Sequence, residues 1–342
     1  MSDHRTVTGT HLFATPPCWR TRCPLRRAPR PPSLRRVAGH LDDEDGAARA
    51  EGLAGLLHVL DLTPSGVDAS GQDLFTGENQ RSPHGRVFGG QVLGQSVVAA
   101  TRTVEPARRV HSMHGYFLRP GDPGTPITFA VERLRDGGSF SARRVHAIQH
   151  GQPILSMIAS FQEDQDGVDH AAPAPQVPAP EDLPSIADLV GRLDHPFARY
   201  WARERPVDVR HVGGPIYLPT APGQPGESGD GSQAVWLRVA GPLGDDQALH
   251  RAVLAWASDV TVLEPVLRRH GAAWATPGIR VASLDHALWW HRPVRADEWM
   301  LFVQETPSAS GARGLGLARV YDRAGTLVAT VAQEGMTRLP PR

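Results

Sequence analysis

The stretch GGQVLGQSVVAATRTV, residues 89–104, is a mostly apolar run that opens on two glycines. It is long enough for a helix buried inside a domain. Strand-like runs follow at residues 110–117, 128–135, 140–149 and 154–162, with turn-forming residues between the last two. A long apolar helix followed by an antiparallel meander can bury itself only if the sheet wraps around the helix. The pattern therefore predicts an α+β unit with a helix at its centre.

The same order of elements returns later in the chain. A strand-like run at residues 233–240 precedes a long apolar, helix-like run at residues 249–270. Further strand-like runs follow at residues 279–290, 299–306, 314–322 and 326–334. Between the two series, residues 164–183 are rich in proline, alanine and aspartate, which is typical of a linker.

Short sequence matches relate the two series. Arg119-Pro120, Ser141-Ala142-Arg143 and Phe161-Gln162-Glu163 correspond to Arg292-Pro293, Gly311-Ala312-Arg313 and Ala332-Gln333-Glu334. The matches occur in the same order and at nearly constant spacing, which indicates an internal duplication. A cleft between the two copies is then the natural binding site.

Four segments follow from this pattern. The first forty residues carry eight arginines, one acidic residue and two Pro-Pro pairs, so residues 1–45 are predicted to be a disordered extension. Residues 46–163 form the N-terminal unit, and residues 164–215 form a linker with a short helix. Residues 216–342 form the C-terminal unit, which carries the candidate catalytic acid.

The composition excludes several classes of function. The 36 basic residues are all arginine and balance 36 acidic residues, so nothing favours nucleic acid or an anionic membrane as a partner. Without lysine, a Schiff base is excluded. Only Cys18 and Cys23 occur, without a second pair of ligands, so neither a disulfide framework nor a metal site is expected. We expect no cofactor. No apolar run approaches the ~20 residues that span a bilayer.

Several motifs together resemble the acyl-CoA thioesterase II family, the TesB-type double-hotdog thioesterases. They are RVFGGQVLGQ (86–95), HSMHGYFLRPGD (111–122), RDGGSFSARRV (135–145), ASD (257–259), DHALWWHRP (285–293) and QEG (333–335). The resemblance covers residues 50–340. It implies a double hotdog, in which each of two tandem units wraps an antiparallel sheet around a long helix, and hydrolysis of fatty acyl-CoA to fatty acid and CoA.

The resemblance also implies a catalytic set of Asp, Thr and Gln that orients and activates a water molecule. These roles fall on Asp259, Ser283 and Gln333. Serine keeps the hydroxyl of threonine but lacks the methyl group that restricts its rotamers. The matched positions in the first unit are Gln91, His111 and Gln162, none of them a carboxylate. We therefore expect the second unit to perform the chemistry and the first to supply the opposite wall of the cleft.

Each candidate also has a structural alternative. The match with Gln91 predicts that Asp259 lies near the N-terminus of its core helix, where an aspartate often caps the helix. Ser283 could simply hydrogen-bond a neighbouring strand, and Gln333 could be a polar strand end. His286 and three other strand histidines are best interpreted as packed side chains. Those three are His111, His114 and His291.

Substrate contacts are predicted at three places. Backbone N–H groups at Gly89, Gly90 and Gln91 could stabilise a developing oxyanion, although the glycines could equally serve close helix packing. The wall of the cleft would include His111. The CoA phosphates would require arginines, and the candidates are Arg135, Arg143, Arg144, Arg313 and Arg319, each of which could be an ordinary surface residue.

Two other functions are compatible with this fold. A hotdog acyl-CoA hydratase or dehydratase would need an Asp/His pair, but the residues after Gly121-Asp122 lack the histidine of that pattern. A non-catalytic acyl-CoA-binding module would not need the carboxylate of Asp259. The C-terminal sequence LPPR lacks a Ser-Lys-Leu peroxisomal signal, so a cytoplasmic location is expected. The resemblance further implies a homo-oligomer, a dimer or tetramer of double hotdogs.

Overall fold

The computed structural model describes residues 42–82, 85–190, 200–201, 205–214, 216–217 and 229–340. Its helices are α1 (Asp42–Leu60), α2 (Gly89–Thr101), α3 (Ile186–Val190), α5 (Gln247–Ser258) and α6 (Glu264–Arg269), with a 3-10 turn, η1, at Pro180–Asp182. The predicted disordered extension lies almost entirely outside the described residues, and α1 begins inside its range. Among the described helices, none has the length and apolar character needed to cross a bilayer.

The strands of the first unit are β1 (Thr63–Val67), β2 (Asp73–Gly77), β3 (Arg108–Phe117), β4 (Ile127–Asp136), β5 (Phe140–Gln149) and β6 (Gln152–Glu163). Those of the second are β7 (Val207–His211), β8 (Ser232–Val239), β9 (Arg280–Ser283), β10 (Asp285–Trp290), β11 (Met300–Ser310), β12 (Arg313–Tyr321) and β13 (Leu327–Arg338). Strands β1 and β7 were not predicted, and β7 lies within the predicted linker.

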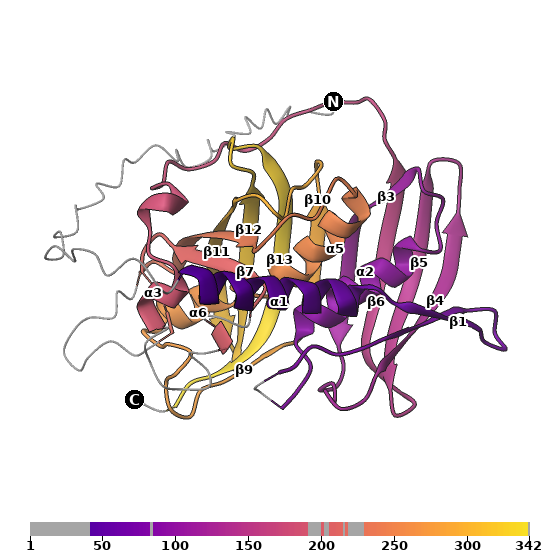
Figure 1. Ribbon diagram of the computed structural model, residues 1–342, viewed down its shortest axis with the longest axis horizontal. Helices are drawn as coiled ribbons and strands as arrows, with labels where there is room; N and C mark the ends of the chain where they lie inside the picture. Colours follow the sequence, from indigo (N-terminus) through magenta and orange to yellow (C-terminus); the bar gives the residue numbers. More distant parts are fainter. Residues whose placement is uncertain are drawn as a thin grey trace, which may run out of the picture. The chain divides into compact units, whose positions relative to one another are not determined.

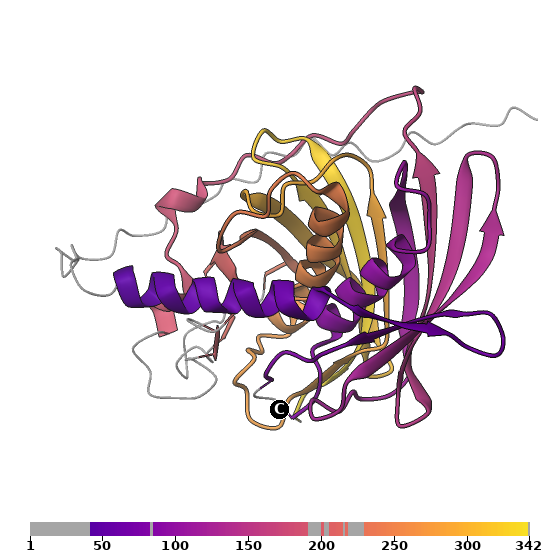
Figure 2. The ribbon, with the colours of Figure 1, turned by 45° about the vertical axis from the view of Figure 1, so that its right-hand side comes forward.

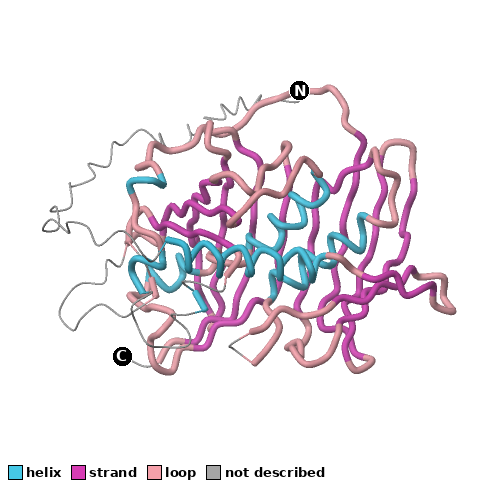
Figure 3. The backbone as a smooth tube through the Cα atoms, in the orientation of Figure 1, coloured by secondary structure: helices cyan, strands magenta, loops and turns pink. Residues whose placement is uncertain are grey.

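In the described part of the chain, all these strands belong to one antiparallel sheet. Its order is β1-β2-β4-β5-β6-β3-β10-β13-β12-β11-β8-β7, with β9 paired to β13. The order is the same on both sides of the β3–β10 pair, which joins the two units. Figures 1 and 2 show the sheet curving around α2 and α5, and Figure 3 shows the helices gathered on one face of the strands. The predicted α+β duplication is confirmed.

The hydrogen bonds of the sheet define the register of the duplication. The N–H groups of Leu118 and Arg119 donate to the carbonyl of Ile154, and those of His291 and Arg292 donate in the same way to the carbonyl of Val328. The Arg-Pro match of the sequence is therefore in register.

The other two sequence matches are wrong by three residues. The pair Asp136–Ser141 at the end of the β4–β5 hairpin has its counterpart in Ala309–Gly314, so Ser141 corresponds to Gly314 and not to Gly311. Counting five residues on from Ile154 and Val328 shows that Gln333 corresponds to Ala159.

The predicted partner of Ser283 changes for the same reason. The strand pairing is interrupted at this point in each unit. In the first unit, Val110 pairs with Phe161, and the register of β3 and β6 shifts after this pair. In the second unit, Ser283 pairs with Gly335 at the end of β9. Ser283 therefore corresponds to Val110, while His111 corresponds to Leu284. The first unit has apolar residues where the second has Ser283 and Gln333.

The glycines of the stretch that predicted the fold let α2 pack closely on α5. A Cβ atom on Gly90 would lie 2.3 Å from the carbonyl oxygen of Trp256, and one on Gly94 would lie 3.0 Å from that of Ala252. No side chain fits in the first of these gaps. Because α2 contacts both α5 and its own sheet, buried apolar residues of both units form one continuous core.

The predicted continuous helix at residues 249–270 is wrong. Helix α5 ends at Ser258, turns follow, and α6 begins at Glu264. The physical reason is Pro265, in the first turn of α6. A proline inside a helix lacks the N–H donor and clashes with the carbonyl four residues earlier, here that of Thr261. Asp259 consequently lies at the C-terminal end of α5 and not, as predicted, near the N-terminus of a helix.

Candidate active site

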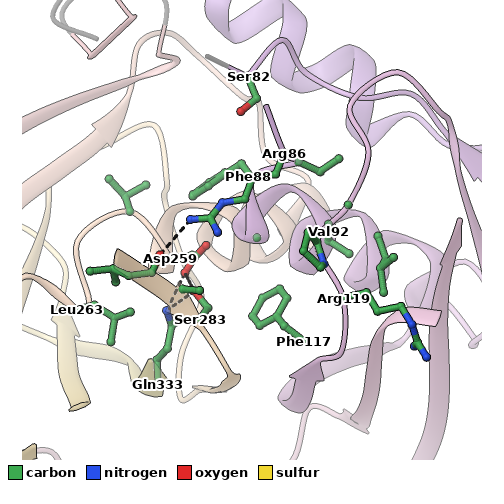
Figure 4. A pocket seen from close by; sticks show the side chains of 18 of the residues that line it. Ser82, Arg86, Phe88, Val92, Phe117, Arg119, Asp259, Leu263, Ser283 and Gln333 are labelled. Atoms are coloured by element: carbon green, nitrogen blue, oxygen red, sulfur yellow. Dashed lines mark hydrogen bonds between the residues drawn. The ribbon is translucent and has the colours of Figure 1, made fainter. Parts of the chain in front are cut away.

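A cavity of about 500 Å³ lies where the N-terminus of α2 faces the turns between α5 and α6. Asp259, Ser283 and Gln333 all line it, as Figure 4 shows, and so do Gly89 and Phe117 of the first unit. Both units therefore contribute to the wall.

The three candidate catalytic side chains form one hydrogen-bonded cluster. Oδ1 of Asp259 accepts hydrogen bonds from Ser283 Oγ at 3.2 Å and from Gln333 Nε2 at 2.9 Å. The same amide nitrogen donates to Ser283 Oγ at 2.8 Å. The hydroxyl of Ser283 thus donates to Oδ1, and the amide of Gln333 donates to Oδ1 and to Ser283 Oγ. The carboxylate is fixed through one oxygen.

The second oxygen of Asp259 faces the first unit. A Cβ atom on Gly89 would lie only 2.7 Å from Oδ2, so only glycine leaves this space open. Within the described residues, no hydrogen bond reaches Oδ2. Because Asp259 is partly exposed and lines the cavity, Oδ2 is the oxygen that a bound water or substrate would meet.

The N-terminus of α2 brings partial positive charge to the cavity wall. The N-cap residue Phe88 makes no side-chain cap hydrogen bond, and the first turn holds no acidic residue. The first N–H groups of a helix have no partner inside the helix and carry partial positive charge. Gly89 lines the cavity, so its backbone is accessible there, whereas Gly90 serves the packing against α5. The packing interpretation thus applies to Gly90, and Gly89 stays a candidate for binding the oxyanion.

The side chain of Gln333 is held in place by His286, whose role the sequence did not reveal. The His286 ring is 1% exposed, with Nδ1 hydrogen-bonded to Gln333 Oε1 and Nε2 lying 2.8 Å from Ser258 Oγ. Because the amide oxygen can only accept, Nδ1 carries the proton. Burial lowers the pKa of His286, although the carboxylate of Asp259 and the bond to Gln333 act in the opposite direction. His286 is therefore a packed histidine, as predicted, but also a positioning residue.

Replacing His286 by leucine is expected to lower kcat about tenfold with little change in KM, because the amide of Gln333 loses the donor that orients it, a loss of about 1.4 kcal/mol. Steady-state kinetics on an acyl-CoA checks this. His286→Asn should restore most of kcat, because its amide N–H can replace Nδ1–H. His291→Leu is the matched control, since His291 bonds Thr330 and does not line the cavity. An unchanged kcat in His286→Leu would contradict the positioning role.

Two predicted contact residues lie in the first unit away from the cavity wall. Gln91 is fully buried, accepts the N–H of Gln80 at 2.8 Å and donates to Asn79 Oδ1 at 2.9 Å. It fixes the chain segment before α2. His111 pairs with Ser160 Oγ at 2.8 Å, and burial lowers its pKa, with a smaller effect from Arg251.

The predicted phosphate-binding arginines also lie outside the cavity wall. Arg143 is 1% exposed and donates to Thr103 and to Asp136 Oδ1 at 2.7 Å, so its charge is already paired. Arg313 is paired with Glu334 at 3.0 Å. The arginines that line the cavity are instead Arg86, Arg119 and Arg205. The first two lie within the motifs of the family resemblance, but Arg205 lies in the predicted linker and had no sequence signal.

Comparisons with known proteins point to one family. A family model described as acyl-CoA thioesterase matches residues 221–336, and one described as acyl-CoA thioesterase N-terminal domain matches residues 79–162. Human acyl-coenzyme A thioesterase 8 is 37% identical over 314 residues, which cover 87% of this chain and 96% of that protein.

Solved structures agree with these matches. The acyl-CoA thioesterase II TesB2 from Mycobacterium marinum is 42% identical, with a TM-score of 0.67, over 83% of this chain and 98% of that one. A conserved protein of unknown function with a hot dog fold from Alicyclobacillus acidocaldarius is 17% identical, with a TM-score of 0.66, over 84% and 98%. The latter likeness concerns the fold alone.

Proposed function

The chain belongs to the acyl-CoA thioesterase family and is a double-hotdog thioester hydrolase, and we propose that it hydrolyses fatty acyl-CoA with Asp259 as the general base. This proposal rests on the hydrogen bonding of the Asp259 carboxylate. One oxygen is held by Ser283 and Gln333, and the other faces the cavity beside the N-terminus of α2.

The reaction follows from this geometry. Oδ2 of Asp259 accepts a proton from a water molecule as the water oxygen attacks the thioester carbonyl carbon. The carbonyl π electrons move to its oxygen and give a tetrahedral oxyanion. When the carbonyl reforms, the C–S bond breaks and the CoA thiolate takes up the proton. One acyl-CoA and one water yield one fatty acid and one CoA thiol.

The backbone of the first unit would stabilise the oxyanion. Gly89 lines the cavity at the N-terminus of α2, so its N–H group and the positive end of the helix dipole would stabilise negative charge that develops on the thioester oxygen. Ser283 and Gln333 were predicted to hold the water directly. Because they bind the carboxylate, we assign them to orienting the base, so that Oδ2 points at the water. Asp259 is not activated by a positive helix end, since it terminates α5 at the C-terminal side.

The alternative functions are less well supported. A hydratase or dehydratase needs an acid–base pair at the acyl chain. His286, the histidine that contacts Gln333, is buried, and its second ring nitrogen bonds Ser258. A non-catalytic binding module would have no need to hold a carboxylate with one free oxygen in the cavity.

Incubating the purified protein with saturated acyl-CoAs of graded chain length tests the proposal. Free CoA thiol is followed with a thiol reagent, and the acyl products are identified by mass spectrometry. We expect equal amounts of thiol and fatty acid. Hydrated or dehydrated acyl-CoA without thiol release would indicate the hydratase alternative, and saturable binding without turnover would indicate the binding module. The predicted cytoplasmic location and homo-oligomeric state belong to the same proposal, and light scattering of the purified protein tests the latter.

A further inference from the structure

Arg205 is a buried cation in the cavity wall. Its side chain is 5% exposed, and its guanidinium carbon lies 3.7 Å from the ring centre of Trp201. The rings of Phe88, Tyr200 and Trp256 surround it at 5.2, 5.6 and 6.0 Å. These rings attract the positive charge through their faces and hold the group in place. They come from both units and from the segment before β7.

The guanidinium lacks the partners that a buried arginine normally has. Within the described residues, Nε and Nη1 have no hydrogen-bond acceptor, and no carboxylate forms an ion pair with the group. Arg143, which is also buried, donates to Thr103, to Asp136 and to backbone carbonyls. A buried N–H group without an acceptor costs about 1–3 kcal/mol, and an aromatic face is only a weak acceptor for it.

We propose that Arg205 binds an anionic oxygen group of the substrate inside the cavity, either a carboxylate on the acyl chain or a phosphate of CoA. This proposal rests on the proposed function, because both groups are parts of an acyl-CoA. Guanidinium is suited to both, since its planar N–H donors match the oxygens of a carboxylate or a phosphate. Because Arg205 lines the cavity, an anion bound there would accept hydrogen bonds from the guanidinium and neutralise the buried charge.

Two other arginines of the cavity differ from Arg205 in ways that make it the specific site. Arg86 and Arg119 are exposed and donate to the backbone carbonyls of Val281 and Pro153. Screening by solvent makes such exposed charges weak and poorly selective. The buried position of Arg205 shields its charge from solvent, so an anion bound there should depend strongly on this one side chain.

Three thioesters with the same chain length separate the two sources of the anion. They are octanoyl-CoA, octanoyl-pantetheine, which lacks the phosphates, and the CoA monothioester of octanedioic acid, which adds a carboxylate. In Arg205→Met we expect KM to rise about tenfold or more for the substrates that carry the bound anion. A phosphate at Arg205 raises KM for both CoA thioesters and leaves that for the pantetheine thioester unchanged. A carboxylate raises KM for the diacid thioester alone.

Arg238→Met is the matched control, because Arg238 also lies over a tryptophan ring, Trp299 at 4.4 Å, but does not line the cavity. It should leave all three KM values unchanged. Arg205→Lys keeps the charge and should retain part of the affinity if Arg205→Met folds poorly. Equal KM values in the Arg205 variants and the unmodified protein, or an equal loss for all three substrates, would overturn the proposal.

Calorimetric titration with CoA and with octanedioate makes the result independent of turnover. Binding of either probe that disappears in Arg205→Met supports the anion site even if no thioester is hydrolysed, and in that case only the proposed function fails. Turnover of all substrates, combined with probe binding that is unchanged in Arg205→Met, rejects the anion site and retains the thioesterase.

Discussion

Replacing Asp259 by asparagine is expected to lower kcat for acyl-CoA hydrolysis by about a thousandfold, because general-base catalysis contributes roughly 10²–10⁴ to a rate. The amide has the shape of the carboxylate but cannot take a proton from water. KM should change little, since the base contributes mainly to the transition state. Thiol release under saturating substrate measures the effect.

The stability of the Asp259→Asn variant separates catalysis from a structural role. Asp259 follows the last turn of α5, where a negative charge is opposed by the helix dipole. Removing that charge should therefore change the free energy of unfolding by less than about 1 kcal/mol. Asp246→Asn is the matched control at the other end of α5, where the side chain caps the helix through Ala248 N–H. Asparagine caps as well as aspartate, so activity should persist.

Activity within tenfold of the unmodified protein in Asp259→Asn would reject Asp259 as the base. Loss of activity together with a clear drop in melting temperature would leave a structural role as the explanation. Only a large loss of kcat in a normally stable variant supports the proposed chemistry.

The elements that could be predicted from the sequence are those with regular periodicity. Residues of β13 alternate between buried and less buried positions, and Gln333 falls on the buried face. Most strands were predicted from strand-like runs, and the α+β class from the order of those runs after a long apolar segment. The three catalytic candidates were predicted from the family resemblance, and the structure brings them within hydrogen-bonding distance of one another.

The register of the duplication was missed because short stretches of similar sequence lie out of register. Arg119 and Arg292 are 173 residues apart and Ile154 and Val328 are 174 apart, whereas Gln162 and Gln333 are only 171 apart. The Gln-Glu pairs of the two strands therefore match in sequence but not in position, and Gln333 was matched with Gln162 instead of Ala159. The break between α5 and α6 did have a signal, Pro265, which the apolar pattern around it concealed.

The roles of His286 and Arg205 depend on contacts between distant parts of the chain. His286 contacts Ser258 on α5 and Gln333 on β13. Arg205 lies among rings from α5, from the residue before α2 and from the segment before β7. Periodicity reports which face a residue occupies, but not which polar atom or ring it meets there. These two roles are therefore visible only in the folded chain.

Gln333→Ala is expected to lower kcat by about a hundredfold, the loss typical of removing one donor from a preorganised polar site. Without the amide, Oδ1 of Asp259 keeps only the hydroxyl of Ser283, and the carboxylate can rotate away from the water. Steady-state assays at saturating substrate measure the change in kcat. Gln162→Ala is the control, because Gln162 is the residue that sequence matching equated with Gln333, and it lies outside the cavity wall. Gln162→Ala should have the kcat of the unmodified protein.

Gln333→Glu tests the same contact through its pH dependence. The new carboxylate would lie where Nε2 now sits 2.9 Å from Asp259 Oδ1, and two like charges at this distance raise the pKa of the pair. Since the base must be deprotonated to act, the acid limb of the kcat/KM profile should move to higher pH. A loss of activity at every pH without that shift of the acid limb would show that Gln333 does not act through Asp259. The proposal that Gln333 holds one carboxylate oxygen while the other accepts the proton would then be wrong.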